Sequence, residues 1–189
     1  MDGDRKKKHW CAWFDLCLPT NEGGAGFSKG NPGSAGGGGI IRDQTGSMIQ
    51  AFTEYYGQSS NNIAEANAML KGIKIYLNAG LSNIVVESKS LWLINIINEK
   101  LDPPWQIKQI IEQITSITSA GNFTFAHIFR EGNFTADLLA NMRENSKSFS
   151  IFTEATFPPL KVRASMKLEF DGLPNFRHRK KNKFISDFS

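Results

Sequence analysis

The chain has 189 residues, of which 40% are apolar, and it carries a formal net charge of +4. This length predicts one domain with flanking segments, and no apolar run reaches the roughly 18 residues that a membrane-spanning helix needs, so no membrane partner is expected. Two cysteines, Cys11 and Cys17, are too few to hold such a domain together by disulfides, which favours a reducing intracellular location, nuclear or cytoplasmic.

Positive charge gathers at both ends of the chain, in the basic runs over residues 5–8 and 177–183. Such runs attract phosphate backbones without reading base sequence, although either run alone is more often a solvated tail or a nuclear-targeting signal. The charge pattern and a change of character after Asn145 predict three parts: a basic N-terminal flank over 1–20, a domain over 21–143, and a C-terminal extension with a basic tail over 144–189.

In chain order, the glycine-dense residues 21–39 predict turns or a close approach of backbones. A hairpin follows, with arms at 40–42 and 47–56, because aspartate followed three residues later by glycine suits a turn at 43–46. Apolar spacing predicts helices over 62–79, 90–100, 105–118 and 134–143 and strands over 83–87 and 122–129, with a further strand within 151–157. This order predicts an α/β domain with a mixed sheet.

Four short motifs stand in a fixed order along this pattern. They are Ser28-Lys29-Gly30-Asn31-Pro32-Gly33, Asn61-Asn62-Ile63-Ala64-Glu65, Val86-Glu87-Ser88-Lys89-Ser90, and His127 followed by Asn133 to Asp137. Together they resemble the ribonuclease H-like domain of the plant reverse-transcriptase-like, retroelement-related family. The resemblance covers residues 28–142 and implies a ribonuclease H-like fold, with a mixed five-stranded sheet flanked by helices.

The resemblance also implies an activity, the metal-dependent endonucleolytic cleavage of RNA in RNA–DNA hybrids. Four carboxylates of this family hold two Mg²⁺ or Mn²⁺ ions, which activate water and stabilise the leaving oxygen. Glu65 matches the second acid and Asp137 the fourth, so both are expected as catalytic residues and metal ligands. His127 matches the histidine that assists product release or proton transfer.

Other matched positions imply contacts with nucleic acid. Asn61 and Asn62 match the asparagines that touch the minor groove and the RNA 2′-hydroxyl, the group that distinguishes RNA from DNA. Gly30 and Asn31 match the loop that meets the sugar–phosphate backbone, and Asn133 is also expected to bind nucleic acid. The expected partner is an RNA–DNA hybrid or RNA, bound by a monomer.

The first and third acids are replaced. Counting back from Gly33 puts Ala25 in the first position, and Lys89 stands in the third. The four positions then carry a net charge of −1, where four carboxylates would carry −4. A unit charge about 4 Å from another is worth roughly 4 kcal/mol at an effective dielectric of 20. Lys89 is therefore expected to disfavour a dication and to pair with Glu65 instead.

Two other carboxylates are alternatives for the missing acid. Asp15 follows Phe14, so residues 13–16 can form the first strand with 18–26 as an insertion, and Asp171 lies in a similar local sequence near the C-terminus. Three functions stay open: a weak nuclease completed by a recruited acid, a non-catalytic module that binds RNA or hybrid, and a decayed retroelement fragment. The substitutions favour weak or lost cleavage.

Overall fold

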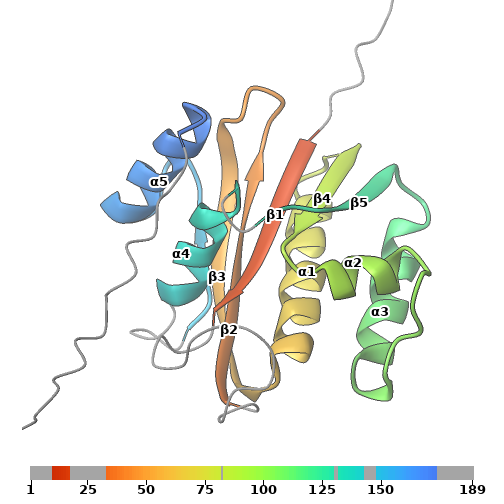
Figure 1. Ribbon diagram of the computed structural model, residues 1–189. Coiled ribbons are helices and arrows are strands. Elements are labelled where there is room, and N and C mark those ends of the chain that lie inside the picture. Colours follow the sequence, from red (N-terminus) through yellow and green to blue (C-terminus); the bar gives the residue numbers. More distant parts are fainter. Residues whose placement is uncertain (1–9, 18–32, 82, 130–131, 143–147, 174–189) are drawn as a thin grey trace, which may run out of the picture.

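The computed structural model describes residues 10–17, 33–81, 83–129, 132–142 and 148–173, the first of these ranges by its backbone. The described strands are β1 (Trp10–Cys17), β2 (Gly33–Arg42), β3 (Met48–Ser59), β4 (Ile84–Ser88), β5 (Phe123–His127) and β6 (Ser150–Phe152). The described helices are α1 (Asn61–Asn78), α2 (Leu91–Ile97), α3 (Trp105–Thr118), α4 (Phe134–Met142) and α5 (Leu160–Phe170). Figure 1 shows the sheet between two groups of helices, with α4 and α5 on one side and α1, α2 and α3 on the other.

The six described strands form one mixed sheet in the order β5-β4-β1-β2-β3-β6. β1 runs antiparallel to β2 and parallel to β4, and β4 runs parallel to β5. The predicted α/β architecture with a mixed sheet is confirmed, and the short β6 beside β3 is a sixth strand where the resemblance implied five.

The central strand β1 comes from a part of the chain that the sequence analysis assigned to a flank. Residues 10–17 include two tryptophans and a phenylalanine, whereas residues 20–26 include three glycines. Aromatic side chains favour a strand and glycine weakens one. The domain therefore begins before residue 20, and the alternative first strand around Phe14 is the one that the structure contains.

Half of the residues of the second strand are glycines, in a part of the chain that was predicted to form turns or a close approach of backbones. A side-chain carbon on Gly37 would lie 2.5 Å from Cβ of Ala68 in α1, and one on Gly38 would lie 2.7 Å from the backbone nitrogen of Ala140 in α4. Because successive strand residues face opposite sides of a sheet, the two glycines let one helix approach from each side. The predicted close approach of backbones is confirmed, and the predicted turn is replaced by strand.

The predicted hairpin is present between β2 and β3. The backbone nitrogen of Gly46 donates to the carbonyl of Asp43 at 2.9 Å, and the Asp43 carboxylate accepts from the nitrogens of Thr45 and Ser47 at 2.8 and 3.0 Å. Gly46 has a φ of 84°, which glycine adopts without strain.

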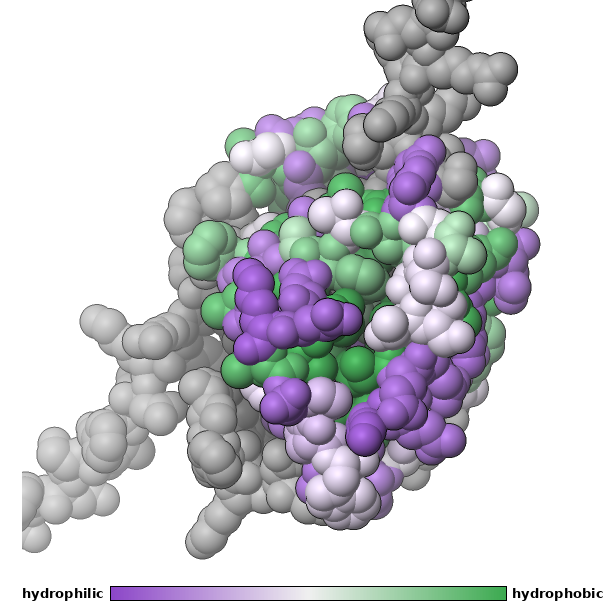
Figure 2. Space-filling model, turned by 90° about the vertical axis from the view of Figure 1, so that its right-hand side faces the viewer, coloured by the Kyte–Doolittle hydropathy of each residue, from purple (hydrophilic) through white to green (hydrophobic). Residues whose placement is uncertain are grey.

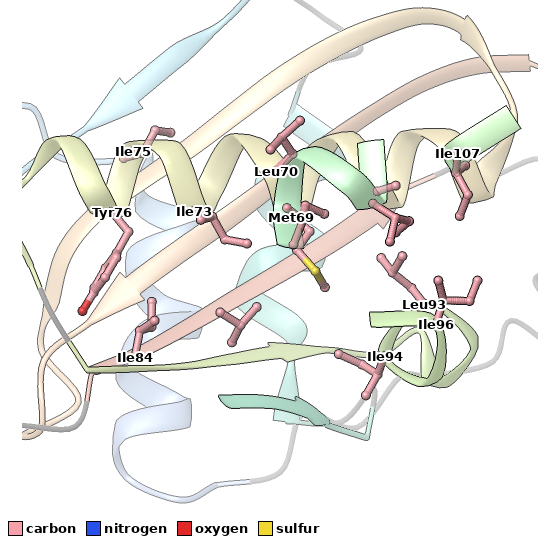
Figure 3. Packing of buried hydrophobic residues seen from close by; sticks show 14 of the residues in the cluster. Met69, Leu70, Ile73, Ile75, Tyr76, Ile84, Leu93, Ile94, Ile96 and Ile107 are labelled. Carbon is pink, nitrogen blue, oxygen red and sulfur yellow. The ribbon is translucent and has the colours of Figure 1, made fainter. Parts of the chain in front are cut away.

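The main core lies between the sheet and the helices α1, α2 and α3. Figure 3 shows Met69, Ile73 and Tyr76 of α1 packed towards Ile84 of β4, with the apolar side chains of α2 beside them. The spacing of these α1 residues is the helical period that predicted the element. Its end is confirmed as well, since Gly80 has a φ of 69° directly after the last turn.

The C-terminal extension forms part of the fold. β6 pairs with β3, and Val162 of α5 packs with Ile40, Ala51 and Leu139 in a second buried cluster. Residues 144–189 were predicted as an extension outside the domain, with a further strand within 151–157. β6 at Ser150–Phe152 agrees with that strand, whereas α5 was not predicted. The inner side of α5 includes the buried Ser165 beside Val162, so polar contacts take the place of an apolar stripe.

The side of the molecule that carries α3 presents an apolar area bordered by hydrophilic patches in Figure 2. Within the described residues, none of the helices has the length and apolar character needed to cross a membrane.

Candidate active site

The carboxyl ends of three parallel strands meet at one edge of the sheet. Phe14 of β1 pairs with Ser88 of β4, which pairs in turn with His127 of β5. Asp15 directly follows Phe14 in the sequence, and Lys89 directly follows Ser88. Ligands of open α/β sheets commonly bind at such an edge, and the matched side chains gather there.

Glu65 reaches this edge from the first turns of α1. Ser60 caps the helix, since its hydroxyl accepts from the backbone nitrogen of Ile63 at 3.4 Å. Burial raises the pKa of Glu65, while a hydrogen bond with Ser90 and the charge of Lys89 act in the opposite direction and are smaller. The carboxyl is therefore easier to protonate than an exposed glutamate, and the site holds less negative charge than its residue types suggest.

Lys89 forms an ion pair with Asp137. Its Nζ lies 3.2 Å from Oδ1 of Asp137, and the two side chains are 18% and 14% exposed. Glu65 is the partner of Lys89 that the sequence predicts. The short contact goes to Asp137 instead, and Glu65 feels the same ammonium electrostatically. The third and fourth acid positions are thus joined by an ammonium–carboxylate contact.

The backbone register places Asp15 beside this pair. β1 and β4 run parallel, so Asp15 stands level with Lys89, one residue beyond the pairing of Phe14 with Ser88. Asp15 also pairs with Gly38, which faces α4. The register therefore brings the backbone of Asp15 to the same edge of the sheet as Lys89. Ala25, the other candidate position, lies outside the described residues, as do Gly30 and Asn31.

Four other predicted residues lie at the ends of elements. Asn61 and Asn62 begin α1. His127 ends β5, and its ring lies 5.4 Å from that of Phe129. Asn133 is fully buried before α4, and its carbonyl accepts from the backbone nitrogen of Asp137 at 3.2 Å.

Asp171 makes no described contact with these residues. It caps the end of α5 and accepts from Lys167, one helical turn earlier, at 2.8 Å.

Two residues of the site escaped the sequence analysis. Ser90 acts to lower the pKa of Glu65 and also caps α2, where its hydroxyl accepts from the nitrogen of Leu93 at 3.4 Å. A serine directly before a helix is a recognisable cap signal, but its reach to Glu65 depends on the fold. Thr135 in the first turn of α4 is buried against Glu169 of α5, and no local pattern predicts that contact.

The side chains that the structure describes do not fit a divalent ion. Among them, no three His, Cys, Asp or Glu residues are grouped closely enough to hold a metal. The Lys89 ammonium lies against Asp137, where a cation would have to bind. Mg²⁺ requires several oxygen ligands, and an ammonium repels it.

Comparison with known proteins identifies the fold and the family of this site. The family model described as "Reverse transcriptase-like" matches residues 23–143. A ribonuclease HI of Halobacterium salinarum is 24% identical over 122 residues, which span 61% of this chain and 59% of that protein. This chain thus spans less than two thirds of that relative's length.

Several solved structures have a similar fold. The RNase H1 of Halobacterium salinarum superposes with a TM-score of 0.64 at 21% identity, covering 72% of this chain and 98% of the other. The N-terminal RNase H domain of Rv2228c from Mycobacterium tuberculosis gives 0.64 at 19% identity, over 74% and 96%. LC11-RNase H1, solved in complex with an RNA/DNA hybrid, gives 0.59 at 26% identity, over 70% and 94%.

Proposed function

Because the chain belongs to the reverse transcriptase-like family, we propose that its ribonuclease H-like domain binds RNA–DNA hybrid or RNA without the help of a divalent metal and cleaves it weakly or not at all. The observation that carries this proposal is the 3.2 Å contact between Lys89 and Asp137. An ammonium occupies the position in which the family's pattern calls for a metal ligand.

The charge of the site supports binding without metal. Asp15, Glu65 and Asp137 are three acidic residues at this edge and Lys89 is one basic residue, so their formal charges sum to −2 where the family's four acids carry −4. Burial also shifts the pKa of Glu65 upward. A phosphate backbone therefore meets fewer negative charges here than at a site of four acids, and less repulsion has to be offset by dications.

Groups around the edge supply contacts of the right chemistry. Asn61 and the exposed Asn62 lie at the start of α1, where the helix dipole favours an anion. Amide side chains can both donate to and accept from a 2′-hydroxyl. The basic runs at 5–8 and 177–183 lie outside the described residues, and their charge adds affinity that falls with salt.

The test is binding of the full chain to a fluorescent RNA–DNA hybrid, measured by anisotropy in EDTA and in Mg²⁺. We expect affinities within about twofold of each other, a steep loss of affinity with added salt, and a preference for the hybrid over an anionic polymer of equal charge. Asn62→Ala should weaken binding, and Lys74→Ala, an exposed change further along the same helix, serves as its control. Binding that requires Mg²⁺, or no preference over the polymer, would refute the proposal.

The register of Asp15 favours a second candidate function, residual cleavage. With Asp15 in the first position, Lys89 is the single departure from the four-acid pattern. We expect Lys89→Asp to restore cleavage of a labelled hybrid in Mg²⁺ or Mn²⁺, and Glu65→Gln in that background to abolish it. Cleavage by the natural chain that is lost on Glu65→Gln would favour this candidate over binding alone.

A nuclear or cytoplasmic location and a plant source stay predictions.

A further inference from the structure

One buried carboxylate links the C-terminal helix α5 to the first turn of α4. Oε1 of Glu169 accepts from the backbone nitrogen of Thr135 at 2.8 Å, and Oε2 accepts from the Thr135 hydroxyl at 2.7 Å. The Glu169 side chain is only 6% exposed. The first backbone N–H groups of a helix have no partner within the helix, and here a residue from another helix supplies one.

The same carboxylate is tied to the end of β2. Nη2 of Arg42 lies 2.7 Å from Oε2 of Glu169, and Nη1 of Arg42 donates to the carbonyl of Gly46 at 3.0 Å. Ser165, one turn earlier in α5, forms a hydrogen bond of 2.7 Å with the Thr135 hydroxyl. Glu169 thus joins a strand end, a hairpin turn and the start of α4 through charge-assisted bonds, which are stronger than neutral ones.

Asp137 lies two residues after Thr135, in the same turn of α4. Where its carboxylate points depends on the rotation and the height of this turn, because side-chain direction on a helix follows from the backbone. The strand beneath α4 offers Gly38, which has no side chain to interlock with the helix. The Glu169 bonds therefore supply a fixed point close to Asp137.

We propose that Glu169 is a positioning residue for Asp137. It fixes the first turn of α4 so that the Asp137 carboxylate meets Lys89, and α5 thereby belongs to the nucleic-acid site. The position of Asp137 is a matter of geometry alone; its importance for nucleic acid rests on the proposed function. A carboxylate at this helix end also complements the helix dipole, which glutamine in the same place would not do to the same degree.

The test is a double-mutant cycle between Lys89 and Asp137, built from Lys89→Met, Asp137→Asn and their combination and measured by urea unfolding. It is run in the natural chain and again with Arg42→Gln/Glu169→Gln, which removes both buried charges together and so leaves neither uncompensated. In the natural chain we expect the effect of the combined substitutions on the unfolding equilibrium constant to differ about threefold or more from the product of the two single effects. In the second background we expect this coupling factor to be close to one.

A control background is Lys71→Met/Glu54→Gln, which removes an ion pair of 3.1 Å between α1 and β3. The Lys89–Asp137 coupling should survive there. If Glu169 were only stabilising, its loss would lower the midpoints of all four chains alike and leave the coupling intact, and that result would overturn the proposal. Loss of coupling in the control background would overturn it as well, because the effect would not be specific to Glu169.

Should Arg42→Gln/Glu169→Gln lack a cooperative transition, Ser165→Ala replaces it, since this change removes one hydroxyl beside Thr135. In that background, a coupling free energy reduced by about half supports the proposal, and an unchanged coupling free energy refutes it. Hybrid binding in the same chains separates the two ideas. A natural chain that fails to bind hybrid, yet loses coupling without Glu169, contradicts the proposed function and leaves the positioning role intact.

Discussion

Replacing Lys89 by aspartate should raise the affinity of this edge for Mn²⁺ by about a thousandfold. Nζ of Lys89 lies 3.2 Å from Oδ1 of Asp137, so a dication bound to that carboxylate would lie about 4 Å from the ammonium. At an effective dielectric of 20, a unit pair at this distance is worth about 4 kcal/mol, and the repulsion of a dication is about 8 kcal/mol.

That repulsion equals the whole binding free energy of a micromolar ligand, about 8 kcal/mol. Lys89 and Asp137 are 18% and 14% exposed, and a swing of the lysine towards solvent relieves part of the repulsion. If half remains, removing it gives about 4 kcal/mol, which corresponds to about a thousandfold in the dissociation constant.

Isothermal titration with Mn²⁺ measures the change in the natural chain, in Lys89→Asp and in Lys74→Asp. The last variant makes the same charge change at an exposed position nine residues beyond Glu65 on α1, about 13 Å along the helix axis. It should bind Mn²⁺ as the natural chain does. Dissociation constants within about tenfold for the natural chain and Lys89→Asp would refute the electrostatic reasoning.

Three further predictions test the fold and the site. Gly38→Ala puts a carbon 2.7 Å from the backbone of α4 and should lower the unfolding free energy by about 1–3 kcal/mol, read from the urea midpoint; an unchanged midpoint would contradict the close packing. Val162→Ala should cost about 2 kcal/mol, while Leu160→Ala at a 75% exposed position should cost less than about 0.5; equal effects, or no cooperative transition in the natural chain, would favour a decayed fragment. Burial raises the pKa of Glu65 above 4.5, so its stabilising contribution is full below that pH and is lost as pH rises through the folded value. Glu65→Gln should therefore unfold at higher urea than the natural chain at pH 8 and lose this advantage towards pH 4.5; parallel curves would contradict the shift.

Periodicity in the sequence was enough to predict the helices that bury an apolar stripe. α1 and α3 were predicted within one residue of their ends, because Ile73 and Ile107 belong to repeats that packing preserves. β2 was not predicted over its full length, since a run of glycines has no alternation of side chains to show which face is buried. α5 was missed for a related reason, because contacts made by Ser165 and Glu169 hold its inner side.

The candidate site was predicted in part. Glu65, Lys89 and Asp137 were identified by motif and lie together, but the partner of Lys89 depends on which helix approaches it from which side. Asp15 was an alternative to Ala25 on sequence grounds, because counting along the chain cannot tell an insertion from a substitution. The pairing of β1 with β2 and β4 decides its place, since strand register is a property of three segments at once.

The glycine strand has one more consequence, for the alignment of the sheet itself. Strands rich in glycine specify their pairing register weakly, because few side chains distinguish one alignment from the next. A slip of β1 against β2 by two residues would carry Asp15 about 7 Å along β2, away from its partner Gly38. Ile40 and Ile41 are buried in the core at one end of β2. Nearer its middle, α1 packs against Gly37 and α4 packs against Gly38. The alignment at the centre of this sheet is therefore held by the helices that press on the strand from both sides.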